Sequence, residues 1–456
     1  MHTFDLLIIG GGPGGYLAAE RAAEGGLQVA LFEERALGGV CLNEGCIPSK
    51  TLLNAAKYYD HALHGEAFGV TVTGAAFDHA QVIARKNQVV KTLVSGVGAK
   101  LKSRRVKVVK ARAEITGKSA EGFSVTAGGE TYVGKRLIIA TGSSPLTPPI
   151  PGVEAGLKSG FVLTNREILD LENLPKKLTI VGGGVIGLEM AAYFQTVGTQ
   201  VTVVEMLDKI GGYTDTEISA LLQKELEKKG VAFYLNAAVT AVTQGAVQVQ
   251  REAGETQMYD ADKVLLSVGR KPAIQGIGLE HIGIYVERGA IVTDSQLRTN
   301  VPGVYAVGDV NGKSMLAHTA YREAEVAVNH ILGKRDTMRY EAVPAVIYTW
   351  PEAASVGETE ESANARGLDV DTVRVPLAYS GRWVAEIVGE EGLCKLIVER
   401  GSRRLLGVHL LAPYASEMIY GASLMLEMRL SVEEIRELIF PHPTVGEVIR
   451  EGLFMI

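Results

Sequence analysis

The stretch LLIIGGGPGGY (residues 6–16) decides the fold, because a short apolar run leads directly into a glycine-rich turn and a helix-like segment. The stretch LTIVGGGVIGLE (residues 178–189) repeats this arrangement. In each copy an acidic residue, Glu33 or Glu205, follows the next apolar run, 23 positions after the first glycine of its loop. One such motif is weak evidence, but two copies in the same strand–loop–helix context predict two dinucleotide-binding units.

The glycines of each loop have separate physical roles. The first permits a tight turn, the second lets the backbone approach a pyrophosphate, and the third lets helix and strand pack closely. Unpaired N–H groups at the helix start then bind the phosphates. The acid accepts hydrogen bonds from ribose hydroxyls, and Glu205 would repel a 2′-phosphate, so we expect the second loop to prefer NAD(H) to NADP(H). The alternative, two ordinary glycine turns in an α/β sheet, is disfavoured by the matched offsets.

Cys41 and Cys46 lie five residues apart in a chain with only three cysteines. A bridge across so short a loop adds little stability. In an unsecreted chain, a close pair is more often a redox couple or half of a metal site than a structural cross-link. The pair begins 26 residues after the first glycine loop ends, which suggests two sulfurs beside a bound dinucleotide. The third cysteine, Cys394, has an apolar strand pattern around it and is predicted to be an inert buried thiol.

Length and charge exclude several classes of protein. The 456 residues predict about three domains. A net charge of −6 argues against a nucleic-acid binder. The basic residues 102–112, which alternate with valines, are predicted to form a solvated edge strand. No apolar run approaches the roughly 20 residues of a membrane span, and no basic region precedes the first apolar segment. We therefore expect no signal peptide and a cytoplasmic setting.

Apolar runs predict further strands at residues 106–113, 123–127, 137–140, 264–268 and 304–307. Residues 145–151 are proline-rich and are predicted to form a linker. After about residue 329 the pattern changes, with strands expected at 394–399 and 405–411 and helices at 415–428 and 432–439. The sequence therefore predicts an α/β fold with two Rossmann-like domains, followed by a separate α+β domain.

Together these motifs resemble the pyridine nucleotide–disulfide oxidoreductases, almost from end to end, and most closely the members that oxidise dihydrolipoamide. LGGVCLNEGCIPSK (residues 37–50) is similar to the family's redox signature, and HPTVGE (442–447) to its C-terminal active-site signature. MLAH (315–318), after Gly308-Asp309, is similar to its second flavin-binding stretch. The resemblance implies an FAD-binding domain (residues 1–147 and 271–338), an NAD-binding domain (148–270) and a dimerisation domain (339–456).

The resemblance also implies which residues contact the cofactors. Tightly but non-covalently bound FAD is expected at Gly10, Gly12, Gly15, Glu33, Glu34, Gly39, Lys50, Ala113, Thr141, Gly142, Ser143, Asp309, Met315, Leu316, Ala317 and His318. NAD is expected at Gly182, Gly184, Val185, Ile186, Gly187, Glu189, Glu205 and Gly269. No metal site is expected.

The resemblance assigns chemical roles to the residues of the redox signature. Cys46 would be the sulfur that lies over the flavin, and Cys41 the sulfur that exchanges with substrate. Lys50 would lie near flavin N5 and pair with Glu189. Taken alone, Lys50 is more simply a solvated helix lysine and Glu189 a first-turn acid that offsets the helix dipole.

His442 stands between two prolines, which restrict its backbone, and Glu447 follows five residues later at an expected helix start. A carboxylate bonded to one imidazole nitrogen leaves the other free to take a thiol proton. A thiol with a pKa near 8.5 needs such a base at neutral pH. The resemblance implies that His442 reaches the cysteines of the other subunit, so that the working unit is a homodimer.

The activity implied is oxidation of protein-bound dihydrolipoamide with reduction of NAD+, through a Cys41–Cys46 disulfide. The expected partner is the lipoyl domain or carrier protein of a 2-oxoacid dehydrogenase complex or of the glycine cleavage system. The main alternative is a glutathione- or mercuric-type disulfide reductase on the same fold. A non-catalytic NAD-sensing subunit is less favoured, and a transhydrogenase without dithiol chemistry is disfavoured, because the cysteine pair and His442 are all present.

The chain departs from the family pattern at two positions. Glu44 stands where the redox signature carries a small apolar residue, and Gly446 replaces the usual serine. We expect Glu44 to place a negative charge near the sulfurs, which would disfavour thiolate and shift the redox potential. We expect Gly446 to loosen the segment that aims Glu447.

Overall fold

The computed structural model describes residues 2–251 and 254–456, and the chain divides into two compact units. Unit 1 consists of Met1–Thr51, Ile83–Leu146 and Gly269–Arg339. Unit 2 consists of Leu52–Val82, Thr147–Val268 and Tyr340–Ile456. This partition differs from the four-part division expected from the sequence, which stays a prediction.

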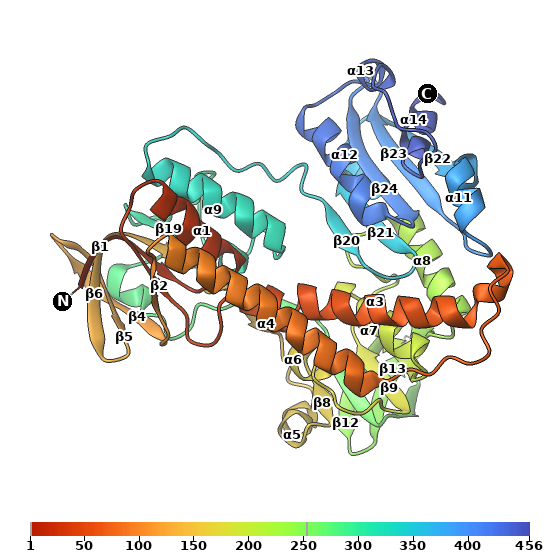
Figure 1. The fold of residues 1–456 in the computed structure, drawn as a ribbon, viewed down its shortest axis with the longest axis horizontal. Coiled ribbons are helices and arrows are strands. Elements are labelled where there is room, and N and C mark those ends of the chain that lie inside the picture. Colours follow the sequence, from red (N-terminus) through yellow and green to blue (C-terminus); the bar gives the residue numbers. More distant parts are fainter. Residues whose placement is uncertain (1, 252–253) are drawn as a thin grey trace. The chain divides into compact units, whose positions relative to one another are not determined.

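Unit 1 is built on a mixed sheet (Figure 1). Its strands run in the order β3-β2-β1-β6-β5-β4, and β19 pairs with the end of β6. The pairs among β3, β2, β1, β6 and β19 are parallel, whereas β4, β5 and β6 form antiparallel pairs. The strands span His2–Ile9 (β1), Val29–Phe32 (β2), Lys107–Val109 (β3), Ala113–Ser119 (β4), Gly122–Ala127 (β5), Glu130–Ile139 (β6) and Val304–Ala306 (β19).

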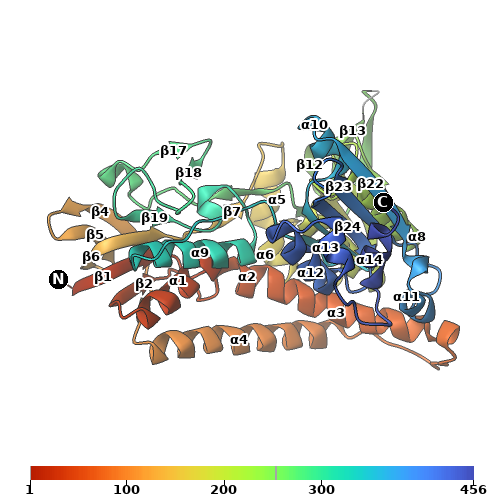
Figure 2. The same ribbon diagram turned by 90° about the horizontal axis from the view of Figure 1, so that it is seen from above.

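The first glycine loop joins β1 to helix α1 (Pro13–Glu24) as the sequence predicts. Gly10 has φ +105°, and a Cβ there would lie 2.2 Å from the carbonyl oxygen of Ala140. A Cβ on Gly15 would lie 1.8 Å from the carbonyl oxygen of Gly10. Only glycine therefore lets α1 start this close to the strand. Helix α9 (Ala317–Ile331) lies beside α1 on the same side of the sheet (Figures 1 and 2).

The prediction of one strand over residues 106–113, and of a basic edge strand over 102–112, was partly wrong. Residues 102 and 103 end helix α4 (His79–Ser103), and β3 is short. β3 and β4 then lie at opposite edges of the sheet. The single apolar run therefore contributes to two strands, β3 and β4, and Lys110–Arg112 connect them. β3 is nevertheless an edge strand with an exposed lysine, as expected.

Short elements complete unit 1. Strand β7 (Ser143–Pro145) pairs antiparallel with β16 (Arg270–Pro272), and β17 (Val286–Glu287) with β18 (Ala290–Ile291). Helix α2 spans Gly39–Glu44, and the 3₁₀ turns are η2 (Leu279–Ile282) and η3 (Asp309–Asn311). Helix α3 (Cys46–Leu63) and α4 each begin in one unit and end in the other. Sequence reasoning singled out neither helix.

Unit 2 holds the second glycine loop on a parallel sheet of order β11-β10-β9-β15-β8. A Cβ on Gly187 would lie 2.2 Å from the carbonyl oxygen of Gly182, which repeats the close packing of the first loop. The elements of this part are α5 (Val153–Ser159), β8 (Val162–Leu163), α6 (Asn165–Ile168), β9 (Lys177–Val181), α7 (Val185–Thr196), β10 (Gln200–Val204), α8 (Thr216–Lys228), β11 (Ala232–Tyr234) and β15 (Lys263–Leu266). An antiparallel sheet of β12 (Ala237–Thr243), β13 (Ala246–Arg251) and β14 (Thr256–Asp260) follows β11.

The C-terminal part of unit 2 is an antiparallel sheet of order β20-β21-β24-β23-β22, with helix α12 packed against β21 and β24 (Figure 1). Its buried residues, Cys394 among them, form one apolar core. The predicted helix over 432–439 ends early, at Arg436. The elements are β20 (Ala345–Ile347), β21 (Glu352–Gly357), α10 (Glu360–Ala365), β22 (Val370–Pro376), η4 (Leu377–Tyr379), α11 (Gly381–Glu386), β23 (Leu393–Glu399), β24 (Leu405–Ala412), α12 (Ala415–Glu427), α13 (Val432–Arg436) and α14 (Glu447–Leu453); η1 (Gly65–Phe68) also belongs to unit 2. Among the helices that the structure describes, none is long and apolar enough to cross a membrane.

A buried ion pair joins α8 to the C-terminal sheet within unit 2. Lys395 on β23 is 1% exposed, and its Nζ lies 2.8 Å from Oδ2 of Asp215, which is 0% exposed and caps α8. Glu217 and Glu360 each place an oxygen 2.7 Å from the same nitrogen. The ammonium therefore contacts three carboxylates. Arg374 also pairs with Glu217 and Glu360, so Lys395 matters most for Asp215, which is fully buried.

We predict that Lys395→Met is strongly destabilising. The variant leaves Asp215 buried without its cation, and breaking a buried pair in this way costs about 3–5 kcal/mol. Arg400→Met is the matched control, since Arg400 directly follows β23, has a 56% exposed side chain and pairs with Asp369 and Asp371. Urea unfolding should show a clearly lower midpoint for Lys395→Met and little change for Arg400→Met. Equal midpoints would contradict the assigned role of the buried pair.

Candidate active site

The first glycine loop and its acid form a cradle that fits a dinucleotide. The N–H of Gly11 donates to Glu33 Oε2 (2.8 Å), and the N–H of Arg35 donates to Oε1 (2.7 Å). These bonds hold the carboxylate over the loop. Gly12 begins α1 without a side-chain cap, so the helix start presents its N–H groups to a ligand. These residues would hold the pyrophosphate and the adenosine ribose of FAD.

The second glycine loop has the same geometry in unit 2. The N–H of Gly183 donates to Glu205 Oε2 (2.6 Å), and the N–H of Leu207 donates to Oε1 (2.9 Å). Gly184 begins α7 without a side-chain cap, and a Cβ there would meet open space. The predicted NAD residues Val185, Ile186 and Gly187 form the first turn of α7. These residues would hold NAD, with the Glu205 carboxylate at the ribose.

The redox signature is attached directly to the first glycine loop. The N–H of Gly38 donates to the carbonyl oxygen of Gly11 (2.8 Å), and a Cβ on Gly39 would lie 2.6 Å from Cα of Gly12. Gly39 then starts α2, which carries Cys41, and Cys46 starts α3. The close backbone approach explains how two cysteines, 26 and 31 residues beyond the end of the loop, come to lie beside the dinucleotide cradle.

Both cysteines of the pair are free thiols in this structure. Each is half-buried. The side-chain hydrogen bond to Cys46, followed by burial, raises the pKa of the Cys41 thiol, and the charge of Lys50 opposes that rise. A thiolate at this pair therefore depends on nearby groups that stabilise its charge. Cys394 is fully buried in the C-terminal core, and burial raises its pKa, as expected for an inert thiol.

Glu44 does not present the unbalanced charge expected from the sequence. The residue is 9% exposed, and its carboxylate forms an ion pair with the guanidinium of Arg35. Arg35 thus contacts the redox segment through its side chain and the cradle acid Glu33 through its backbone. This ion pair could not be predicted, because nothing in the sequence indicates that Arg35, nine residues earlier, pairs with Glu44.

We predict opposite shifts of the dithiol potential when the two members of this pair are removed singly. Arg35→Met leaves a negative charge that disfavours thiolate, so the potential becomes more negative. Glu44→Val leaves a positive charge and shifts the potential upward, each by on the order of 10–30 mV. The double variant should return close to the native value. Equilibration with the lipoamide couple measures this, and an absence of any shift in both single variants would contradict the charge balance.

Hydrogen bonds join the strand exits where the flavin residues are predicted. Thr141 Oγ1 donates to the carbonyl oxygen of Ala273 (2.7 Å), and the Ser143 hydroxyl donates to the Asp309 carboxylate. Arg270 Nε donates to Ser143 Oγ (2.7 Å). Buried Glu323 accepts the N–H of Gly308 (2.5 Å) and so supports the turn that carries Asp309. Sequence reasoning missed Glu323 and Arg270, which nothing in the local pattern identifies.

The other predicted flavin residues also belong to unit 1. Glu34 is exposed beside Glu33, and Ala113 is buried at the start of β4. Gly142 has φ +70° after β6. Met315 and Leu316 precede α9, and Ala317 and His318 form its first turn. One compact unit therefore contains every residue predicted to contact FAD.

Two expectations at the NAD site involve residues that belong to different units. Glu189 is 3% exposed on α7 and accepts the N–H of Tyr348 (3.2 Å), both in unit 2. Lys50 belongs to unit 1, so its pairing with Glu189 stays a prediction. Gly269, expected at the NAD site, begins a segment of unit 1.

His442 and Glu447 form the predicted acid–base pair in unit 2. His442 Nδ1 lies 2.8 Å from Glu447 Oε1, and the imidazole side chain is 79% exposed. The N–H of Thr444 donates to the other carboxylate oxygen (2.8 Å). Burial raises the pKa of Glu447, but the bonds from Thr444 and His442 outweigh it and lower the pKa. The carboxylate therefore accepts Nδ1–H and leaves Nε2 exposed as a proton acceptor.

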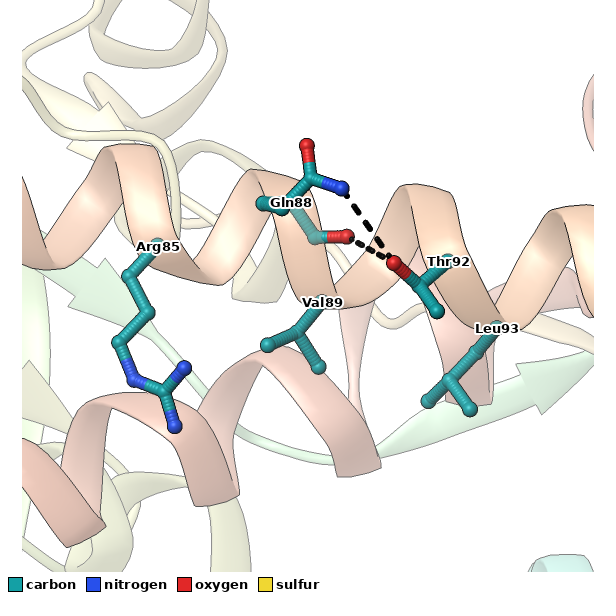
Figure 3. Close-up of a pocket in the computed structure, with 5 residues that line it drawn as sticks. All are labelled: Arg85, Gln88, Val89, Thr92 and Leu93. Atoms are coloured by element: carbon teal, nitrogen blue, oxygen red, sulfur yellow. Dashed lines mark hydrogen bonds between the residues drawn. The ribbon is translucent and has the colours of Figure 1, made fainter.

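A hollow of about 300 Å³ lies along α4, lined by Arg85, Gln88, Val89, Thr92 and Leu93 (Figure 3). All five side chains come from successive turns of one helix, and Thr92 Oγ1 donates to the carbonyl oxygen of Gln88 (2.9 Å). None is a predicted redox or cofactor residue. The hollow is therefore not assigned to the site.

Two family descriptions match the chain. Residues 4–324 match the pyridine nucleotide-disulphide oxidoreductases, and residues 343–453 match the dimerisation domain of that family. The second match includes His442 and Glu447. In the described residues, no group of His, Cys, Asp and Glu side chains could hold a metal ion.

Several similar proteins are named dihydrolipoyl dehydrogenase. Dihydrolipoyl dehydrogenase of Chlamydia muridarum is 38% identical, with 100% of this chain and 97% of that protein covered. The enzymes of Bacillus subtilis and of Pisum sativum mitochondria are each 40% identical over 98% of this chain, and 97% and 90% of those proteins are covered. Among solved structures, LpdA of Mycobacterium tuberculosis has a TM-score of 0.89 at 28% identity, with 100% of this chain and 99% of that chain covered. A Cu(II) complex of the HOCl-induced flavoprotein disulfide reductase RclA of Escherichia coli has a TM-score of 0.88 at 29% identity, with both chains fully covered.

Proposed function

This chain belongs to the pyridine nucleotide–disulphide oxidoreductase family, and on that premise we propose that it oxidises dihydrolipoamide to lipoamide and reduces NAD+ to NADH, with FAD as its flavin. The observation that carries the proposal is the dithiol of Cys41 and Cys46, held against a dinucleotide cradle. The relatives named dihydrolipoyl dehydrogenase match over the full length, which supports the choice of substrate.

The residues of this chain would carry out the sulfur and proton chemistry. His442 Nε2 takes the proton of a dihydrolipoamide thiol, and the thiolate attacks Sγ of Cys41 in a Cys41–Cys46 disulfide. The S–S bond breaks and leaves Cys46 as a thiolate. The second substrate thiol then attacks the lipoyl sulfur of the mixed disulfide and closes the lipoamide ring; the S–S bond to Cys41 breaks, and the proton of this second thiol passes to the departing Cys41 sulfur, which leaves as a thiol. FAD, when bound, supplies the two-electron chemistry that links the dithiol to NAD.

The imidazolium formed at His442 would be stabilised by Glu447. The carboxylate is already bonded to Nδ1, so protonation at Nε2 places a positive charge beside a negative one without moving either group. Thr444 holds the other carboxylate oxygen and limits rotation of Glu447. This hydrogen bond supports a fixed orientation of the Glu447 carboxylate toward His442, despite the glycine at position 446.

The working unit would be a homodimer. The match of residues 343–453 to the dimerisation domain supports association of two chains. We propose that His442 of one chain serves the cysteine pair of the other. The lipoyl group would be presented by a separate lipoyl domain or carrier protein of a 2-oxoacid dehydrogenase complex or of the glycine cleavage system, in the cytoplasm.

A second candidate is reduction of another disulfide, favoured by the similarity to the RclA disulfide reductase. One assay series separates the two. The purified flavoprotein is given anaerobic dihydrolipoamide with NAD+ or NADP+, and oxidised glutathione with NADH or NADPH, in separate reactions. We expect turnover with dihydrolipoamide and NAD+, because Glu205 disfavours a 2′-phosphate. Turnover with glutathione, or a clear preference for NADP+, would overturn the proposed function.

A further inference from the structure

Two tyrosines form a hydroxyl pair that the proposed mechanism does not use. Tyr16 stands on α1, directly after the first glycine loop, and Tyr321 stands on α9, three residues after His318. Their hydroxyl oxygens lie 2.5 Å apart, and their rings meet edge to face with centroids 6.0 Å apart. Both side chains are half-buried. The two helices that frame the flavin cradle are thus bridged by phenols.

The backbone places Tyr16 beside the redox segment: the N–H of Tyr16 donates to the carbonyl oxygen of Gly12 (2.9 Å), and a Cβ on Gly39, two residues before Cys41, would lie 2.6 Å from Cα of Gly12. Burial, the mutual hydrogen bond and then charge on Cys41 and Cys46 raise the pKa of Tyr16. Burial also raises the pKa of Tyr321, with a further contribution from the same sulfurs. Both phenols therefore stay protonated at neutral pH and act as neutral donors.

A count of protons shows that one donor is left over. Two hydroxyls carry two protons, and only one proton lies between the two oxygens. Among the described residues, the recorded hydrogen bond of each hydroxyl is the bond to the other. The second proton has no protein acceptor there. A neutral thiol is a weak acceptor, whereas a thiolate is a strong one, so this proton gains a partner when the dithiol ionises.

We propose that the Tyr16–Tyr321 pair is a hydrogen-bond donor to the reduced Cys41–Cys46 pair, directly or through one water, and that it favours the thiolate form. The inference rests on the dithiol role given to the cysteines and extends it to two residues outside the redox signature. The donated bond is strengthened by the second hydroxyl, because each hydrogen bond in a chain polarises the next.

The other charges around the dithiol act separately from the phenols. Lys50 faces Cys41 and favours its thiolate. Lys100 lies near Tyr321 but pairs with Glu20, with Nζ 3.1 Å from its oxygen. Arg35 and Glu44 balance each other. These groups stay unchanged when a tyrosine is replaced by phenylalanine, so the phenol contribution can be isolated.

The test is the pH profile of iodoacetamide alkylation in the reduced holoenzyme, because alkylation follows the thiolate fraction and does not require substrate turnover. Tyr16→Phe/Tyr321→Phe should shift the profile to higher pH and slow alkylation at neutral pH about tenfold. At least one single variant should show most of the shift, and it identifies the hydroxyl that faces the sulfurs.

Tyr305→Phe is the matched control. The Tyr305 hydroxyl also forms a hydrogen bond with a residue of α9, His330 (2.8 Å), but the sulfurs do not contribute to the shift of its pKa. We expect the native profile for this variant. If the double variant also kept the native profile, the donor role would be overturned. A shifted profile in a protein inactive with dihydrolipoamide would support the donor role and overturn only the substrate assignment.

Discussion

Cys46→Ser is expected to bind FAD as the native chain does and to lose dihydrolipoamide turnover by on the order of 10³-fold or more. A serine oxygen cannot form the disulfide that the substrate thiolate attacks, so no two-electron exchange with the substrate takes place. The FAD cradle should survive, because its hydrogen bonds come from Gly11, Glu33 and Arg35 rather than from Cys46. Flavin absorbance of the purified variant and NADH formation under saturating substrate measure the two parts of this result.

Cys394→Ala is the control for this variant. Cys394 is 0% exposed in the C-terminal core and has no role in the proposed chemistry. The variant removes one sulfur from a chain with three cysteines, as Cys46→Ser does, and should turn over dihydrolipoamide at close to the native rate. Native turnover in Cys46→Ser, or its loss in Cys394→Ala with FAD retained, would refute the assignment of the redox pair.

His442→Gln is expected to lower kcat by about 10²–10⁴-fold, the usual contribution of a positioned general base. Glutamine can still bond to Glu447, but its amide cannot take a thiol proton at neutral pH. The loss should shrink as the pH is raised toward the thiol pKa of about 8.5, because the substrate then ionises without help. A pH series of dihydrolipoamide oxidation by the native and variant proteins measures this dependence.

His64→Gln offers a close control. His64 is also an exposed histidine whose Nδ1 lies near a carboxylate, at 3.2 Å from Asp60 Oδ1. It lies outside both the redox and the C-terminal signatures, so the variant should keep native rates at every pH. A pH-independent loss in His442→Gln would point to misfolding of the C-terminal segment instead of loss of a base.

The parts predicted well from sequence are those set by local pattern. The two glycine loops, the strands before them and the acids after them are placed as expected, because glycine spacing and apolar runs act over about 30 residues. Glu447 begins α14, as its position after His442 suggested. The roles of these residues at bound cofactors and substrate remain predictions.

The features that sequence missed depend on contacts between distant segments. Tyr16 and Tyr321 lie 305 positions apart, and Glu323 reaches back to the turn before Asp309. Arg35 pairs with Glu44 only because α2 begins against the first glycine loop. Such pairs leave no periodic signal in one sequence. The prediction of one strand over residues 106–113 was partly wrong for a related reason: the two halves of this run belong to strands at opposite edges of one sheet.

Stepwise anaerobic reduction of the freshly purified protein tests most directly whether a sulfur pair exchanges electrons with a bound flavin. We predict a yellow protein that takes up about four electrons per chain, two for the dithiol couple and two for FAD, with two free thiols appearing as the first two electrons enter. Cys46→Ser should take up only about two. A colourless native protein, or one that takes up two electrons without the appearance of thiols, would contradict the central claim.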